Sequence, residues 1–206
     1  MQFKMHQYHL RRGTTFGECY CSPDRQQIYI NIPKNASTWT NPHLRQQGWS
    51  LSNFHLQDLS QAKAIVALRE PVERWFSGIA EYFWLYHRNL DLSQVNQVFF
   101  DLVFDQIVFD DHTEKQVYFI DGFPLEQCVW FWVSPNYSAA IAQYLALPIK
   151  DVEHAYVTKG NEFKTNLQQL LKTQYQSNQT YQGQLKNYFR DDYKLINSVR
   201  TWQKWY

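Results

Sequence analysis

The chain has 206 residues, of which 44% are hydrophobic and 17% aromatic, and its formal net charge is +1. This length is sufficient for a domain with a hydrophobic core, and the apolar fraction excludes a disordered chain. The near-neutral charge argues against a protein that coats nucleic acid or an anionic membrane, although a local basic cluster can still bind a small anion.

The first buried strand is predicted at Gln27–Ile32, a short run rich in β-branched and aromatic residues. Residues 33–39 follow it and read PKNASTW. A loop here that leads into a helix would present backbone N–H groups to an anion. Ser37 and Thr38 add hydroxyl groups and can also cap the helix, while Lys34 adds a positive charge. The segment lacks the glycines of a Walker A loop, so a generic ATP or GTP site is disfavoured, and a plain strand-to-helix turn remains the alternative.

A second buried strand is predicted at Lys63–Leu68, and a helix at Pro71–His87. Pro71 suits the first position of a helix, and Glu73 suits its first turn. Apolar residues recur along this helix every three to four positions, as expected for a face that packs on a core.

Arg69 falls at the carboxyl end of the second strand, and Ser77 falls two turns into the following helix. Arg69 can bind a phosphate through its guanidinium while Ser77 donates a hydroxyl hydrogen bond to the same group. The alternative is a surface arginine paired with Glu70 or Glu73, which contributes little to stability.

The rest of the chain continues the alternation of strands and helices. Strands are predicted at Gln116–Ile120 and Val129–Val133, and helices at Tyr137–Leu147 and Leu185–Val199, whereas the Gln/Asn-rich stretch Gln174–Gln184 is predicted to be a loop. This order predicts an α/β fold of three layers, with a mainly parallel central sheet flanked by helices. Ligands bind such sheets at the carboxyl ends of the strands, so both segments described above are expected to lie beside a site.

The ordered pair IPKNAST (residues 32–38) and LREPVERWFSG (residues 68–78) resembles the sulfotransferases that use 3′-phosphoadenosine-5′-phosphosulfate (PAPS), particularly their carbohydrate (Golgi-type) branch. The resemblance implies a single P-loop-like domain over residues 1–206, in a compact version. It also implies that the first segment holds the 5′-phosphosulfate of the donor and the second its 3′-phosphate. Residue by residue, it assigns the donor site to Lys34, Asn35, Ala36, Ser37, Thr38, Arg69 and Ser77.

The chain departs from the family pattern at two positions near the first segment. Trp39 stands where relatives often have a small or hydroxyl residue, and Pro42 comes early in the helix that should follow. Two further segments match the family pattern more weakly. Residues 111–116 (DHTEKQ) resemble the family segment H-x-x-P-Q, and residues 188–193 (YFRDDY) resemble Y-x-x-D-[FY]. Residues 157–161 fall where relatives bring a late loop towards the nucleotide.

The resemblance implies sulfuryl transfer from PAPS to an acceptor hydroxyl or amine, with adenosine 3′,5′-bisphosphate as the product. Lys34 is the expected catalytic residue that offsets charge on the leaving oxygen. His55 is the first candidate for the general base and His112 the second, while His43 and Glu81 are weaker alternatives. The residues of the two motifs resemble those of the carbohydrate branch, which favours a glycan or a small polyol as acceptor. A small P-loop-like kinase and a nucleotide-binding module without turnover remain alternatives.

Other features set limits on cofactors and location. Cys19, Cys21 and Cys128 fit neither a disulfide framework nor a four-ligand zinc site, so we expect reduced structural thiols and no metal. The first residues lack the apolar segment of a signal peptide, and the chain has no run of about 18 apolar residues. We therefore expect a cytoplasmic protein with no membrane span and no nucleic-acid partner. The oligomeric state stays open.

Overall fold

The computed structural model describes residues 19–52, 62–147 and 161–202, and contacts divide the chain into two compact units. Among the described residues, the sheet unit comprises 19–52, 62–70, 116–147 and 194–202, and the helical unit comprises 71–115 and 161–193. Each unit has its own hydrophobic core. The expectation of one domain over residues 1–206 stays a prediction.

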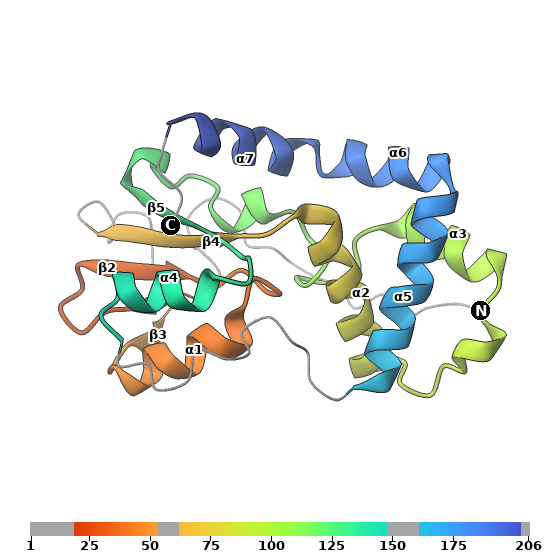
Figure 1. Ribbon diagram of the computed structural model, residues 1–206, viewed down its shortest axis with the longest axis horizontal. Coiled ribbons are helices and arrows are strands. Elements are labelled where there is room, and N and C mark those ends of the chain that lie inside the picture. The colour runs from red at the N-terminus through yellow and green to blue at the C-terminus, as the bar shows by residue number, and fades with distance from the viewer. Residues whose placement is uncertain (1–18, 53–61, 148–160, 203–206) are drawn as a thin grey trace. The chain divides into compact units, whose positions relative to one another are not determined.

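The sheet unit is built on a five-stranded mixed sheet with the strand order β3-β1-β2-β4-β5 (Figure 1). Strands β2, β4 and β5 run parallel, whereas β1 pairs antiparallel with both β2 and β3. The α/β class is confirmed, but the prediction of a mainly parallel sheet is confirmed only for the half that contains β2, β4 and β5. The strands are β1 Cys19–Cys21, β2 Gln27–Ile30, β3 Ser50–Ser52, β4 Lys63–Leu68 and β5 Cys128–Trp132.

Both faces of the sheet are covered by helices (Figure 1). Side chains alternate along β4, so Ile65 packs in one core cluster and Val66 in the opposite one. Helices α1 (Ser37–Gln46) and α4 (Tyr137–Tyr144) cover the face of Ile65, and the part of α7 (Arg190–Trp202) in this unit covers the other. A strand that is buried on both faces appears in the sequence as a continuous apolar run. The observed first and last residues of β4 are therefore the predicted ones.

The helical unit has a core dominated by aromatic side chains from α2, α3 and α6. Two ion pairs join α2 to α5, from Lys164 to Glu81 at 2.8 Å and from Lys172 to Glu73 at 2.6 Å. The helices of this unit are α2 Pro71–Tyr86, α3 Gln97–Gln106, α5 Glu162–Ser177, α6 Gln179–Tyr188 and the first turn of α7, and the short 3₁₀ helices of the described chain are η2 Leu92–Gln94, η3 Gln116–Phe119 and η4 Leu125–Gln127.

Two predicted elements are wrong, and a third is confirmed as helical but is divided into two helices. In the predicted strand at 116–120, residues 116–119 form a 3₁₀ helix instead. A short apolar run does not distinguish the two structures, and the tertiary contacts of the Gln116 side chain decide between them. The predicted loop at 174–184 is helical except at Asn178, whose side chain accepts hydrogen bonds from the first N–H groups of α6. The predicted helix at 185–199 is divided at Phe189 into α6 and α7.

The prediction also missed β1 and β3, which have three residues each and are too short to show a periodic pattern. The three cysteines are buried and do not form disulfides with one another, and burial raises the pKa of the Cys128 thiol to about 12. Within the three described ranges, no helix is both long enough and apolar enough to cross a lipid bilayer.

Candidate functional site

The loop between β2 and α1 contains two residues with a left-handed backbone. Lys34 has a φ of 69° and Ala36 a φ of 62°, a region that residues other than glycine rarely adopt. Each such residue costs on the order of 1–3 kcal/mol and persists where the surrounding structure holds it. Left-handed residues in a turn can direct successive backbone N–H groups to one side, which creates an anion-binding concavity.

The carbonyl groups of this loop are held by side chains of the sheet unit. The Arg69 guanidinium donates to the carbonyl oxygen of Lys34 at 3.2 Å, and the Thr40 hydroxyl donates to that of Ala36 at 3.1 Å. The hydroxyl of Tyr137 lies 2.9 Å from the Thr40 hydroxyl. Burial raises the pKa of Tyr137, so its hydroxyl stays protonated. These contacts stabilise the unusual backbone from inside the core.

The first N–H groups of α1 follow directly after this loop. Those of Ala36, Ser37 and Thr38 have no acceptor within the described part of the chain, as expected for the first residues of a helix. Ala36 is the N-cap and makes no side-chain cap bond, so the prediction that Ser37 or Thr38 caps the helix is wrong. Both hydroxyl groups instead lie in the first helical turn, where the helix dipole favours an anion.

Trp39 and Pro42, the two departures from the family pattern, both lie within α1. Trp39 is buried, and its ring stacks on that of His43 at 4.2 Å between centroids. His43 Nδ1 also bonds to the carbonyl oxygen of Trp39 at 2.7 Å. His43 therefore has a structural explanation, and α1 continues through Pro42.

A network of amide groups connects this loop to Arg69. Asn35 is fully buried, and its Nδ2 donates to the Ala67 carbonyl and to Gln116 Oε1, both at 2.7 Å. Gln116 Oε1 accepts from the Arg69 N–H at 3.0 Å, and Gln116 Nε2 donates to the Arg69 carbonyl at 2.9 Å. The structure thus brings Lys34, Asn35 and Arg69 together at the carboxyl ends of β2 and β4. The sequence prediction did not include Gln116, although it lies in the DHTEKQ segment.

Ser77 and Arg74 lie on α2, in the helical unit, and both are buried. The Arg74 guanidinium donates to the carbonyl groups of Asp111 and Glu114. One turn after Arg74, a Cβ added to Gly78 would lie 2.2 Å from the carbonyl oxygen of His112. Arg74 and Gly78 therefore hold residues 111–114 against α2, a role that the sequence prediction missed.

His112 is held between two carboxylates. Its Nδ1 lies 2.9 Å from Asp110 and 3.1 Å from Asp111. Burial alone would lower the pKa of His112, but the hydrogen bonds and charges of both aspartates outweigh it and raise the pKa to about 9. His112 is therefore protonated at neutral pH, which disfavours it as a general base.

Two other candidate bases remain. Glu81 is in the ion pair with Lys164 and is only partly exposed, which disfavours proton transfer by its carboxylate. His55, the first candidate, lies outside the described residues, so its role stays a prediction. Residues 157–160 of the expected late loop also lie outside them.

The two weaker matches, DHTEKQ and YFRDDY, contact each other within the helical unit through residues 114, 115, 188 and 191. The Tyr188 hydroxyl donates to the Glu114 carboxylate. Lys115 lies 3.2 Å from the Asp191 carboxylate and 4.9 Å from the centre of the Tyr188 ring. Lys115, which replaces the family proline, therefore acts as a cross-link to the start of α7.

Within the described ranges, the side chains of Asp110, Asp111 and His112 have ligand atoms that lie within 4.8 Å of one another and could hold a metal ion. The ion pairs of His112 account for this arrangement without a metal. The three residues are consecutive and form a local turn, so we assign no metal site to them.

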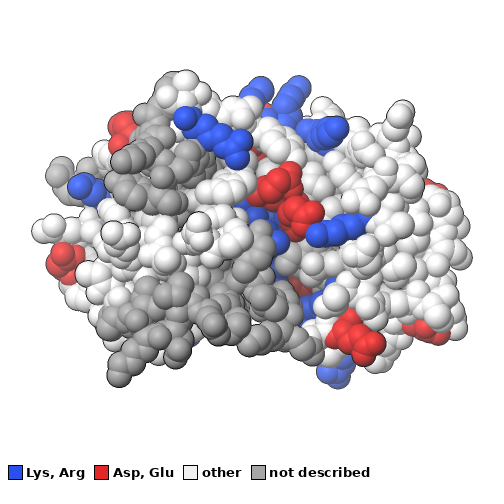
Figure 2. Space-filling model, in the orientation of Figure 1, with Lys and Arg blue, Asp and Glu red and all other residues white. Residues whose placement is uncertain are grey.

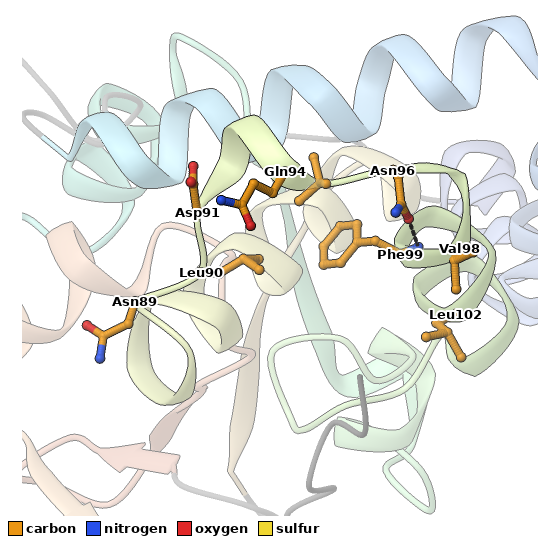
Figure 3. A pocket seen from close by; sticks show the side chains of 9 residues that line it. Asn89, Leu90, Asp91, Gln94, Asn96, Val98, Phe99 and Leu102 are labelled. Carbon is orange, nitrogen blue, oxygen red and sulfur yellow. Dashed lines mark hydrogen bonds between the residues drawn. The ribbon is translucent and has the colours of Figure 1, made fainter.

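A pocket of about 450 Å³ lies elsewhere in the helical unit, between η2 and α3 (Figure 3). Leu90, Phe99 and Leu102 contribute apolar lining. Asn96 accepts a hydrogen bond from the Phe99 N–H, and Asp91 accepts bonds from Ser93, so these two polar groups cap helices. The pocket therefore offers less specific chemistry than the loop after β2.

Basic and acidic side chains lie interspersed on the face that Figure 2 shows, as expected for a net charge of +1. On this face, recognition of an anion would therefore depend on local groups and not on a broad basic surface. No protein-family model, no curated protein and no solved structure matches this chain. The assignment of a function depends on the geometry of the site and on the resemblance of its motifs.

Proposed function

We propose that this protein is a PAPS-dependent sulfotransferase with a P-loop-like fold, whose donor site lies at the carboxyl ends of β2 and β4. One observation carries the proposal: the two motifs follow adjacent parallel strands, and Arg69 of the second motif donates a hydrogen bond to Lys34 of the first. Parallel α/β sheets bind nucleotides at this edge. The N–H groups at the start of α1 and the neighbouring hydroxyls support an anionic ligand.

In this proposal the residues of the first loop bind the 5′ end of the donor. The N–H groups and hydroxyls of Ser37 and Thr38 hold the 5′-phosphosulfate, and Lys34 offsets the charge that develops on the leaving oxygen. Arg69 binds the 3′-phosphate through its guanidinium. Ser77 is assigned to the same phosphate by the resemblance alone.

The reaction forms a bond between the acceptor oxygen or nitrogen and the sulfur atom, and it breaks the bond from sulfur to the bridging phosphate oxygen. The acceptor proton passes to a general base, for which His55 stays the proposed residue. The products are the sulfated acceptor and adenosine 3′,5′-bisphosphate. A glycan or a small polyol is the proposed acceptor.

Calorimetric titration of adenosine 3′,5′-bisphosphate, with AMP and ATP as competing probes, tests the donor site. We expect the bisphosphate to bind more tightly than either probe, because only it offers both a 5′- and a 3′-phosphate. Binding led by ATP would favour the kinase alternative, and no binding would contradict the proposed site. Tight binding without sulfation in a screen of sugars and polyols with labelled PAPS would favour the module without turnover.

A further inference from the structure

The side-chain amide of Gln116 pairs with the backbone of Arg69 as a neighbouring strand would. It accepts from the Arg69 N–H at 3.0 Å and donates to the Arg69 carbonyl at 2.9 Å. Gln116 is fully buried and begins η3, which lies 47 residues after Arg69 along the chain. The bonds therefore fix the backbone of Arg69 just beyond the last residue of β4.

The same amide oxygen also accepts from Asn35 Nδ2 at 2.7 Å. The direction of each bond is determined by its partners, because a carbonyl oxygen needs a donor and an N–H needs an acceptor. Since Arg69 donates to the carbonyl of Lys34, the neighbour of Asn35, the contacts close a ring through three segments of the sheet unit. A change at any member of this ring is expected to affect the others.

We infer that Gln116 is a positioning residue that holds Arg69 and the loop at residues 33–38 in a fixed relation, so that one ligand can contact both. This inference rests on the proposed function. Gln116 acts through Arg69 and Asn35 and not on the reacting atoms. A ligand with two phosphates would depend on it more strongly than a ligand that contacts the first loop only.

The first test compares Gln116→Met with the wild-type protein. Methionine keeps the length of the side chain but removes its hydrogen-bonding groups. We expect the Kd for adenosine 3′,5′-bisphosphate to rise about tenfold, while the Kd for AMP changes much less. Gln143→Met, at an exposed position on α4, is the matched control and should change neither value. An unchanged ratio of the two Kd values in a folded variant would overturn the inference.

Gln116→Glu is a second variant, which keeps the test decisive if Gln116→Met does not fold. It keeps an acceptor for Asn35 and for the Arg69 N–H but loses the donor to the Arg69 carbonyl, so we expect a smaller change in the same direction. A Gln116→Glu protein that binds both ligands like the wild type would count against the positioning role.

A measurement without ligand separates this inference from the proposed function. The Asn35 N–H donates to the Ile32 carbonyl at 3.2 Å inside the loop and does not touch Gln116. We expect its hydrogen exchange, followed by NMR, to accelerate in Gln116→Met and Gln116→Glu but not in Gln143→Met. If exchange is faster but the protein binds no bisphosphate, the proposed function is refuted while the coupling of Gln116 to the loop at residues 33–38 is supported. Unchanged exchange would refute the coupling, whatever the protein binds.

Discussion

Arg69 and Lys34 come from different motifs, yet a hydrogen bond of 3.2 Å joins the Arg69 guanidinium to the Lys34 carbonyl oxygen. This bond turns the Lys34 carbonyl towards β4 and stabilises the left-handed backbone of Lys34. It also places the positive charge of Arg69 beside the loop that precedes α1. A cation and a set of backbone N–H groups at one edge of the sheet form a suitable site for a phosphate-containing ligand.

Arg69→Ala is expected to remove the preference for ligands with a 3′-phosphate. A hydrogen bond to a charged group contributes roughly 1.5–3 kcal/mol, which corresponds to about 10- to 150-fold in affinity. The affinities for adenosine 3′,5′-bisphosphate and AMP, measured by calorimetry, should therefore converge in this variant. Arg45→Ala removes an exposed arginine of the same unit and should keep the difference. If Arg69→Ala still discriminates between the two ligands, another residue binds the 3′-phosphate.

Lys34→Ala is expected to lower kcat by about 100-fold or more while it weakens bisphosphate binding only several-fold, because Lys34 is proposed to act on charge that develops during transfer. Single-turnover sulfation and calorimetry measure the two effects separately. Lys63→Ala removes the same charge from the other end of β4 and serves as the control. Equal losses of rate and binding would show that Lys34 only anchors the donor.

Gly78→Ala is expected to destabilise the protein by about 1–3 kcal/mol, because the added Cβ would lie 2.2 Å from a backbone oxygen that cannot easily move. Gly183→Ala provides a matched control on α6, since a Cβ there meets nothing within 4 Å. This second variant should stabilise the helix by about 0.5–1 kcal/mol. Urea denaturation measures both changes, and the same sign for both would contradict the close packing of α2 on residue 112.

The pKa of His112 predicts how stability depends on pH. Because its folded-state pKa of about 9 lies above the ordinary value of 6.5, its stabilising contribution is complete below pH 6.5 and is lost as the pH rises to about 9. This contribution is at most about 3 kcal/mol. His112→Gln should therefore be less stable than the wild type at pH 6, and the difference in unfolding free energy should shrink by pH 9.5. Parallel pH profiles for the two proteins would show that the ion pairs with Asp110 and Asp111 do not stabilise the fold.

Sequence alone determined the elements whose pattern is local. β4 was predicted at its observed bounds because both of its faces are buried, and α2 begins at Pro71 because proline fits the first turn of a helix. The order of strand, loop and helix around residues 33–38 was also predicted correctly. The loop itself was chosen for its residue types, and its role in binding stays a prediction.

Only the tertiary structure decided how the site is assembled. The left-handed backbone of Lys34 and Ala36 has no local signal, because neither residue is glycine and the bonds that hold them come from distant segments. The sequence pattern predicted that Gln116 begins a strand. Its side chain instead bonds to Arg69 and Asn35, which lie 47 and 81 positions earlier in the chain. The raised pKa of His112 likewise depends on how two carboxylates are oriented around its ring. A periodic pattern reports which side of an element is buried, whereas hydrogen bonds between distant residues depend on how the chain packs as a whole.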